Sequence, residues 1–353
     1  MPRPLPPDPF VHSDKAIYDV YIANRASAAL SVAHQLGIFR LVAERQRTLL
    51  ELCELLKTER RPLDALLTAL VSLGLLRREG KGVDGLLAAK SAAKYAPTPL
   101  VLDHLLPESP FYIGGLIDME NECFVTPSNL LEAMRRNAPE IYGGSDPWER
   151  ISADRQTAAN FTRSMQSVSI RPAFSLAAVF DFSSVRSLLD VGGGSGILAV
   201  AAALRNRSLR AMILELPTVA EVARETVAEY QLADRVTIVV GDMFTDQLPA
   251  GHDAILFSQI LHDWPPDTAR MLLAKARDAL QNGGQVLVHE KLLNDARDGP
   301  VATALASLDM LFWTRGQQYS APELHALLEE AGFGAPRTVP TVDYWSITWA
   351  QTR

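Results

Sequence analysis

A glycine-rich turn constrains the fold of this chain more than any other feature. It is the stretch Leu188-Leu-Asp-Val-Gly-Gly-Gly-Ser-Gly196, where an apolar run ends in glycines and an amphipathic stretch follows. A strand, a glycine turn and a helix in this order are typical of a nucleotide-binding α/β domain. Any tight strand-to-helix turn also favours glycine, so the surrounding sequence has to support the assignment.

Short apolar runs alternate with amphipathic stretches from Arg186 onward. Buried strands are expected at 187–191, 210–215, 236–240, 254–257 and 285–289, and helices at 197–205, 219–230, 266–280 and 322–331. Such alternation predicts an α/β fold, a parallel sheet with helices on both faces. The stretch 343–350 alternates apolar and polar residues and predicts an antiparallel edge strand.

The residues before this domain are predicted to be helical. Helices are expected near 23–39, 48–56 and 62–74, followed by a hairpin with its tip at 77–82. Three helices and a hairpin make a winged helix, which is all-helical apart from the wing. We predict three parts: this N-terminal domain over 1–104, a helical linker and acceptor-binding region over 105–180, and the α/β domain over 181–353.

Charge and composition exclude several classes of protein. The chain has 34 basic and 41 acidic side chains, and within the winged helix they are mixed, as in Lys57-Thr-Glu-Arg-Arg61. Nucleic-acid binding needs concentrated positive charge, so we expect dimerisation instead. A membrane span is not expected, because no run of about 18 apolar residues occurs. A start without a secretion signal and only two cysteines, Cys53 and Cys123, favour the cytoplasm.

Acidic residues after the next two predicted strands indicate the kind of nucleotide. Glu215 ends the second strand and is placed to accept hydrogen bonds from both hydroxyls of a ribose. Gly241-Asp-Met-Phe244 ends the third strand. There Asp242 is expected to accept from an adenine amino group while Met243 and Phe244 flank the ring.

The spacing of the glycines argues against a dinucleotide. The dinucleotide pattern G-x-G-x-x-G, counted from Gly192, needs a third glycine where this chain has Ile197 after Gly196. A cofactor without a pyrophosphate fits better. We therefore predict S-adenosylmethionine (SAM), which has a ribose, an adenine and an amino-acid tail.

Taken together, the motifs resemble small-molecule O-methyltransferases of the plant caffeate and acetylserotonin type and their bacterial natural-product relatives. The resemblance rests on Leu188–Gly196, Glu215-Leu-Pro217, Gly241–Phe244, Ile260-Leu-His-Asp-Trp264 and Asn282-Gly-Gly284. It covers nearly the whole chain. It implies a Rossmann-like SAM domain with a mostly parallel seven-stranded sheet, and a homodimer built through the N-terminal domain. The implied acceptor is a small aromatic compound of secondary metabolism, such as an antibiotic intermediate.

The resemblance also implies the cofactor-binding residues. They are Asp190, Gly192, Gly193, Gly194, Glu215, Leu216, Gly241, Asp242, Met243, Phe244, Ser258 and Trp264. Ser258 stands where some relatives have a lysine that helps to hold the cofactor.

His262 is implied to be the general base. Phenols have a pKa of about 10, and a neutral imidazole with a pKa near 6.5 accepts their proton as the methyl group approaches. The family supports this histidine with two glutamates, of which Glu290 matches one. Gln318 stands in place of the other and cannot offset an imidazolium charge. This departure, with bulky Trp313, leaves open a C-methyltransferase that acts on a phenolic amino acid or a 2-oxo acid.

Four residues are predicted to contact the acceptor: Met165, Phe161, Asp263 and Trp313. The resemblance places Met165 beside the methyl group, and Trp313 should shrink the acceptor pocket. Contact with the cofactor and capping of the next helix are alternatives for Asp263.

Two further alternatives remain at this point. A metal held by His262, Asp263 and His289 is not expected, because His289 is next to Glu290 on a strand and points to the opposite face. A non-catalytic winged-helix regulator that binds SAM as a ligand predicts a concentrated basic face over 48–94.

Overall fold

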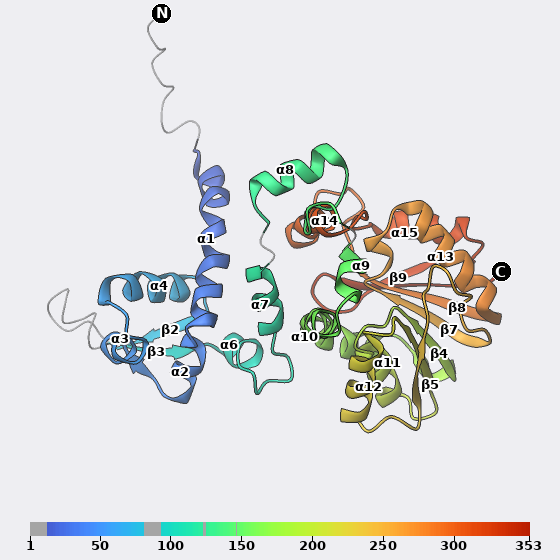
Figure 1. Ribbon diagram of the computed structural model, residues 1–353, viewed down its shortest axis with the longest axis horizontal. Coiled ribbons are helices and arrows are strands. Elements are labelled where there is room, and N and C mark those ends of the chain that lie inside the picture. The colour runs from blue at the N-terminus through green and yellow to red at the C-terminus, as the bar shows by residue number, and fades with distance from the viewer. Residues whose placement is uncertain (1–12, 81–92, 123–124, 146) are drawn as a thin grey trace, which may run out of the picture. The chain divides into compact units, whose positions relative to one another are not determined.

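The computed structural model describes residues 13–80, 93–122, 125–145 and 147–353 (Figure 1). The chain divides into two compact units, Met1–Asn121 and Glu122–Arg353. This boundary falls inside the linker predicted over 105–180. The division into three parts remains a prediction.

The N-terminal unit combines helices with a small sheet. Its elements are α1 (Lys15–Gln35), α2 (Ile38–Glu44), β1 (Arg47–Thr48), α3 (Leu49–Leu56), α4 (Arg60–Ser72), β2 (Leu76–Glu79), β3 (Lys94–Pro97), α6 (Pro99–His104) and α7 (Gly114–Glu122). Among its described residues, β3 pairs antiparallel with β1 on one side and β2 on the other. β2 and β3 are the strands of the predicted wing. The placement of its tip is wrong for residues 77–79, which pair with β3 as part of β2, and positions 81 and 82 lie outside the described residues.

Local signals explain where these helices begin and end. The helix expected to run to residue 39 ends at Gln35, because Gly37 takes a left-handed conformation with φ 67° and turns the chain into α2. Thr48 and Glu51 form a capping box at the start of α3. Leucines of α3 and α4, such as Leu52 and Leu67, then share one buried core.

The C-terminal unit contains the predicted α/β domain. Its elements are α8 (Pro127–Arg136), α9 (Pro147–Ser152), α10 (Arg155–Val179), η1 (Phe182–Ser184), β4 (Ser187–Val191), α11 (Ile197–Arg205), β5 (Arg210–Glu215), α12 (Ala220–Glu229), β6 (Val236–Val240), β7 (His252–Ser258), η2 (Leu261–Asp263), α13 (Pro266–Ala279), β8 (Leu280–Lys291), α14 (Val301–Trp313), α15 (Ala321–Glu330), β9 (Arg337–Pro340) and β10 (Trp345–Gln351). In the described part of this unit, seven strands form one sheet in the order β6-β5-β4-β7-β8-β10-β9. The strands β4 to β8 are parallel, and β10 is antiparallel to both neighbours. The predicted mostly parallel seven-stranded sheet is confirmed.

Two elements differ from the sequence prediction. The stretch 343–350 forms β10, antiparallel as expected, but the prediction of an edge strand is wrong because β9 pairs with its outer side. β9 is short and ends in a proline, which suits a sheet edge and gives little alternation to detect. The helix α14 was not predicted, because its apolar residues lie all round the helix rather than on one face.

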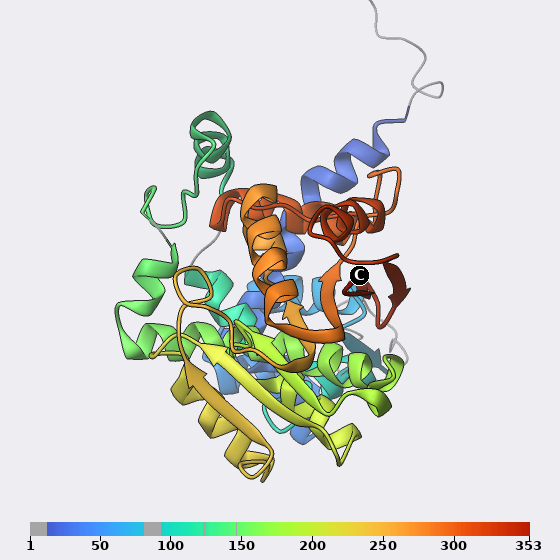
Figure 2. The same ribbon diagram turned by 90° about the vertical axis from the view of Figure 1, so that its right-hand side faces the viewer.

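Helices cover both faces of the sheet (Figures 1 and 2). On one face, α10, α11 and α12 pack against strand residues such as Leu188 and Leu287. On the other, α13 and α15 pack against Leu189 and Val288. Neighbouring residues of a strand point to opposite faces. The strands are therefore apolar throughout, as their sequences indicated.

The strand order reverses at β4, which pairs with β5 on one side and with β7 on the other. In parallel sheets, ligands bind beyond the carboxyl ends of the strands at such a point. The glycine turn follows β4 and the predicted base follows β7. The fold thus carries both to the same edge of the sheet.

Candidate active site

Two glycines of the turn pack so closely against neighbouring side chains that a Cβ would not fit. A Cβ on Gly193 would lie 2.8 Å from the carboxyl of Asp190, and one on Gly196 would lie 2.5 Å from Ile213. Gly196 also has a φ of 78° and caps α11. A Cβ on Gly194 would meet no described atom within 4 Å. The open side of the turn is therefore at Gly194, and the other glycines are needed for close packing.

Asp190 lies beneath this turn as a buried carboxyl group. It is 1% exposed, and neither carboxyl oxygen accepts a well-formed hydrogen bond from the described residues, although the backbone N–H of Ala199 is near enough to act against the rise of its pKa. Burial, with the charge of Glu215 adding to it, raises the pKa of Asp190 to about 7. A buried carboxyl without a partner is costly. A ligand with an amino group or another donor would satisfy it.

The predicted ribose and adenine residues are held by backbone groups. Glu215 accepts hydrogen bonds from the N–H of Gly194 at 2.9 Å and of Leu216 at 2.7 Å, and burial raises its pKa. Asp242 accepts from the N–H of Phe244 at 2.8 Å. Each carboxyl oxygen has two lone pairs, so both side chains can accept a further hydrogen bond.

The loop after β6 is held in place from α13. Lys275 Nζ donates to the carbonyl of Met243 at 2.6 Å and of Phe244 at 2.9 Å. Phe244 packs edge-on against Trp264, with ring centroids 4.6 Å apart. Sequence reasoning missed Lys275, because no motif links it to a loop some thirty residues away. Ser258 lies at the end of β7 with its hydroxyl 3.2 Å from His289 Nδ1.

The three predicted catalytic side chains meet at one point. His262 lies in η2, directly after β7, and its Nδ1 is 3.0 Å from Gln318 Nε2 and 3.1 Å from Glu290 Oε2. Its Nε2 is 3.6 Å from Asp263 Oδ1. Glu290 comes from the end of β8, and Gln318 from the segment between α14 and α15.

Burial sets the charge of this cluster. It lowers the pKa of His262 to about 3, with the charge of Lys291 acting in the same direction. It raises the pKa of Glu290 to about 8 and that of Asp263 well above its ordinary value. At neutral pH, His262 is therefore an uncharged imidazole. Its nitrogen lone pair is free to accept a proton, but the lowered pKa makes it a weaker base than an ordinary histidine.

Aromatic rings lead from the cofactor residues toward the predicted acceptor residues. Trp264 lies 6.2 Å from Trp148, Trp148 lies 5.9 Å from Phe161, and Phe161 lies 6.2 Å from Trp313, between ring centroids. Phe161 is on α10, where Met165 follows one turn later. Sequence reasoning missed Trp148, because it belongs to none of the motifs from which the site was predicted.

His289 is turned away from this cluster. Its ring stacks on Trp345 at 4.9 Å, and burial lowers its pKa to about 3. Within the described residues, no group of three His, Cys, Asp or Glu side chains is arranged to hold a metal ion.

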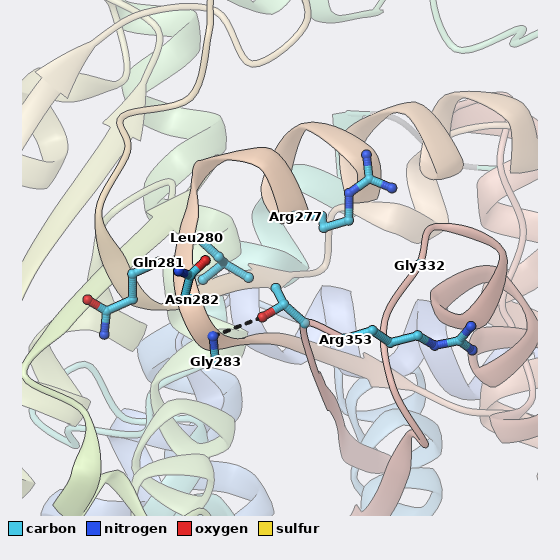
Figure 3. Close-up of a pocket in the computed structure, with 8 residues that line it drawn as sticks. Arg277, Leu280, Gln281, Asn282, Gly283, Gly332 and Arg353 are labelled. Carbon is cyan, nitrogen blue, oxygen red and sulfur yellow. Dashed lines mark hydrogen bonds between the residues drawn. The ribbon is translucent and has the colours of Figure 1, made fainter.

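A cavity of about 310 Å³ is lined by residues that include Leu280, Gln281 and Arg277 (Figure 3). Its lining includes the first residues of β8, whereas Glu290 is near the end of that strand, roughly 30 Å away by strand rise. Arg277 is already bonded to Ala331 and Asp278, and Arg353 donates to Phe333. This cavity therefore plays no part in the candidate active site.

Comparison with protein families decides the class. Residues 128–334 match an O-methyltransferase domain, and residues 20–101 match an O-methyltransferase dimerisation domain. The chain belongs to the O-methyltransferase family.

Individual relatives agree with this. The methyltransferase is 35% identical over 312 residues to 3-hydroxy-5-methyl-1-naphthoate 3-O-methyltransferase of Streptomyces sahachiroi, covering 88% of this chain and 86% of that one. It is 34% identical over 232 residues to L-tyrosine C(3)-methyltransferase of Streptomyces lavendulae, covering 63% and 62%. Its structure is similar to that of human N-acetylserotonin methyltransferase in complex with SAM, with a TM-score of 0.83, 26% identity, and 96% and 97% coverage.

These matches confirm the predicted resemblance and the cofactor class. The chain is a SAM-dependent methyltransferase. The alternative of a non-catalytic regulator is set aside, because the chain matches the methyltransferase domain as well as the dimerisation domain.

Proposed function

We propose that this methyltransferase transfers the methyl group of SAM to a phenolic hydroxyl of a small aromatic natural-product intermediate, with His262 as general base. The observation that carries this proposal is the cluster of His262, Glu290 and Gln318 at the carboxyl edge of the sheet. The similarity to a hydroxynaphthoate 3-O-methyltransferase supports an aromatic hydroxyl acceptor.

The surroundings of the glycine turn fit the cofactor. The unpartnered carboxyl of Asp190 suits the cationic amino group of its methionine part, and Glu215 has lone pairs left for ribose hydroxyls. Gly194 lets a ligand approach the backbone. We assign the adenine to the loop at Asp242–Phe244 and to Trp264.

His262 performs the proton chemistry in this proposal. SAM, when bound, supplies an electrophilic methyl group on a sulfonium sulfur. We assign the ring hydrogen of neutral His262 to Nδ1, which lies 3.1 Å from Glu290 Oε2 and beside the side-chain amide of Gln318, whose oxygen must then face the ring. Nε2 is then the nitrogen that accepts the hydroxyl proton. Only the ionised form of Glu290 stabilises the imidazolium that results, and because burial raises the pKa of Glu290 to about 8, this support becomes stronger above that pH. Phe161, Met165 and Trp313 hold the acceptor ring so that its oxygen is aligned with the methyl group.

One observation favours C-methylation as a second candidate. Gln318 is an amide within hydrogen-bond distance of His262, so Glu290 is the only carboxyl group that faces Nδ1 among the described residues. With less stabilisation of its imidazolium, His262 is a weaker base. A weak base is sufficient to remove the acidic ring proton that is left after the methyl group has bonded to carbon. The similarity to a tyrosine C(3)-methyltransferase points the same way.

The N-terminal unit supports the proposal of a homodimer. It matches an O-methyltransferase dimerisation domain, and α1 exposes apolar side chains that include Ile17 and Val20. Among the described residues, no single helix is long and apolar enough to cross a membrane, although α1 and α2, bent by 60°, pass that test of length and composition as a pair. The cytoplasmic location remains a prediction.

Replacing the base tests the mechanism. We expect His262→Ala to lower kcat by ~10²–10⁴-fold while the Kd for SAM stays near the wild-type value. Turnover is measured with labelled SAM and a panel of phenols and hydroxynaphthoates. The matched control is His325→Ala, a histidine that bonds to Thr338 away from the cluster. Unchanged turnover in His262→Ala would show that the proton leaves by another route.

A further inference from the structure

The segment 314–319, between α14 and α15, lies directly against the residues that carry the proposed base. Gln318 contacts the ring of His262, as described above. One residue later, the Tyr319 hydroxyl donates to the carbonyl of Trp264 at 3.4 Å. The segment thus contacts both ends of the short stretch from His262 to Trp264.

Between these contacts, Gly316 lies against the main chain of the base itself. A Cβ on Gly316 would lie 1.8 Å from the carbonyl oxygen of His262, 2.6 Å from its carbonyl carbon and 2.5 Å from that of Asp263. Real Cβ atoms essentially never come this close to other atoms. Glycine is required here for space, since a side chain would force the two backbones apart.

The segment is fixed at its other end by α14. Thr314 Oγ1 donates to the carbonyl of Met310 at 2.9 Å and accepts from the N–H of Gly316 at 3.2 Å. The N–H of Gln318 donates to Ser307 Oγ at 3.2 Å. Because α14 ends in Trp313, the helix that carries an acceptor residue also fixes the segment against the base.

We propose that Gly316 is a positioning residue, which lets the segment 314–319 hold His262 at the distance and orientation that proton transfer needs. The inference rests on the proposed role of His262. A displacement of about 1 Å costs roughly 10²-fold in rate, and a Cβ at Gly316 would force a displacement of that size. The effect is expected in kcat, because the backbone shift acts on the base rather than on the glycine turn.

A double-mutant cycle tests this proposal. We expect Gly316→Ala to lower kcat by ~10²-fold in the wild-type background and to cause little further loss in the His262→Ala background. The control is Gly334→Ala, where a Cβ would lie in ordinary contact 3.5 Å from Gln351 and kcat should not change. Losses that multiply in the double variant, or an unchanged kcat in Gly316→Ala, would overturn the proposal.

A second variant covers the case in which Gly316→Ala does not fold. Thr314→Val keeps the side-chain shape and removes the two hydrogen bonds of the hydroxyl, to Gly316 and to Met310, while the bond from the backbone N–H of residue 314 to Met310 remains. We expect a loss of roughly 5–10-fold in kcat that again disappears in the His262→Ala background. A loss that persists there would overturn the proposal.

NMR of the His262 ring separates this inference from the proposed function. The ring resonances should shift in Gly316→Ala or Thr314→Val and stay in place in Gly334→Ala. If the ring resonances shift in the segment variants while His262→Ala turns over normally, the base role is refuted but the positioning is not. Unshifted resonances in both segment variants would refute the positioning.

Discussion

At the scale of single residues, burial decides the chemistry of the candidate site. His262, Glu290 and Asp263 are ordinary titratable side chains, yet each is buried and favours its uncharged form. A neutral imidazole is ready to accept a proton, whereas a protonated glutamic acid gives less support to the imidazolium. The amide of Gln318 adds no charge of its own. Activity therefore depends on how the proton is shared between His262 and Glu290.

The raised pKa of Glu290 predicts a pH dependence of stability. Burial raises this pKa from 4.5 to about 8, so the folded state favours the protonated form. The contribution of Glu290 to the free energy of unfolding is therefore fully present below its unfolded pKa of 4.5. It is lost as the pH rises through its folded pKa of about 8. Glu290→Gln keeps the shape and removes the titration. Between about pH 5 and pH 9 its Tm should fall by a few degrees less than that of the wild type.

Thermal melts at both pH values measure this difference. Glu330→Gln, which changes a half-exposed glutamate on α15 that pairs with Arg270, serves as the control and should follow the wild type. Equal pH dependence of Tm in Glu290→Gln and the wild type would contradict the buried, protonated state of Glu290.

At the scale of elements, the sequence predicted the parallel strands and the site residues at their carboxyl ends. The turn at Gly192–Gly196, Glu215 and His262 all follow apolar runs that became β4, β5 and β7. These signals are local, because a strand that is buried on both faces must be apolar along its length.

The remaining parts depend on contacts between distant segments. Trp148 and Lys275 join the site only because α9 and α13 pack near it, and neither has a motif of its own. The closeness of Gly316 to His262 depends on the path of the segment after α14, a helix that the sequence did not predict. Local sequence patterns contain no information on such pairings.

The link from α13 to the loop after β6 predicts an effect on cofactor binding. Lys275→Met removes two hydrogen bonds from the ammonium group to the carbonyls of Met243 and Phe244. We expect the Kd for S-adenosylhomocysteine to rise by ~10-fold with a smaller change in kcat, because the loop is proposed to hold the adenine. Calorimetry measures the Kd.

The matched control on the same helix is Arg270→Met. It removes a cation that pairs with Asp267 and Glu330, away from this loop. Its Kd should match the wild type. A wild-type Kd in Lys275→Met would show that the loop does not need this support.

At the scale of the whole molecule, the N-terminal unit is expected to join two chains. Ile17 and Val20 on α1 are 76% and 78% exposed, and Tyr18 and Tyr21 beside them are exposed as well, so α1 presents a group of large apolar side chains. Because the N-terminal unit matches a dimerisation domain, we expect a second copy of this chain to cover these side chains.

The double variant Ile17→Asp/Val20→Asp should therefore be a monomer. Four charges in the interface of a symmetric dimer would repel one another and lose their water. Light scattering coupled to size-exclusion chromatography measures the mass. Leu204→Asp, at an exposed apolar position of α11, is the control and should remain dimeric. A dimer in the double variant would place the interface elsewhere.

The central claim, methyl transfer to an aromatic hydroxyl, is tested most directly by identifying the product. The purified enzyme is incubated with SAM that carries an isotope-labelled methyl group and with phenols and hydroxynaphthoates, and the products are analysed by mass spectrometry and NMR. The account predicts a labelled methyl group bonded to a phenolic oxygen, and no product without the enzyme. A methyl group bonded to a ring carbon, or no labelled product from any aromatic acceptor, would contradict it.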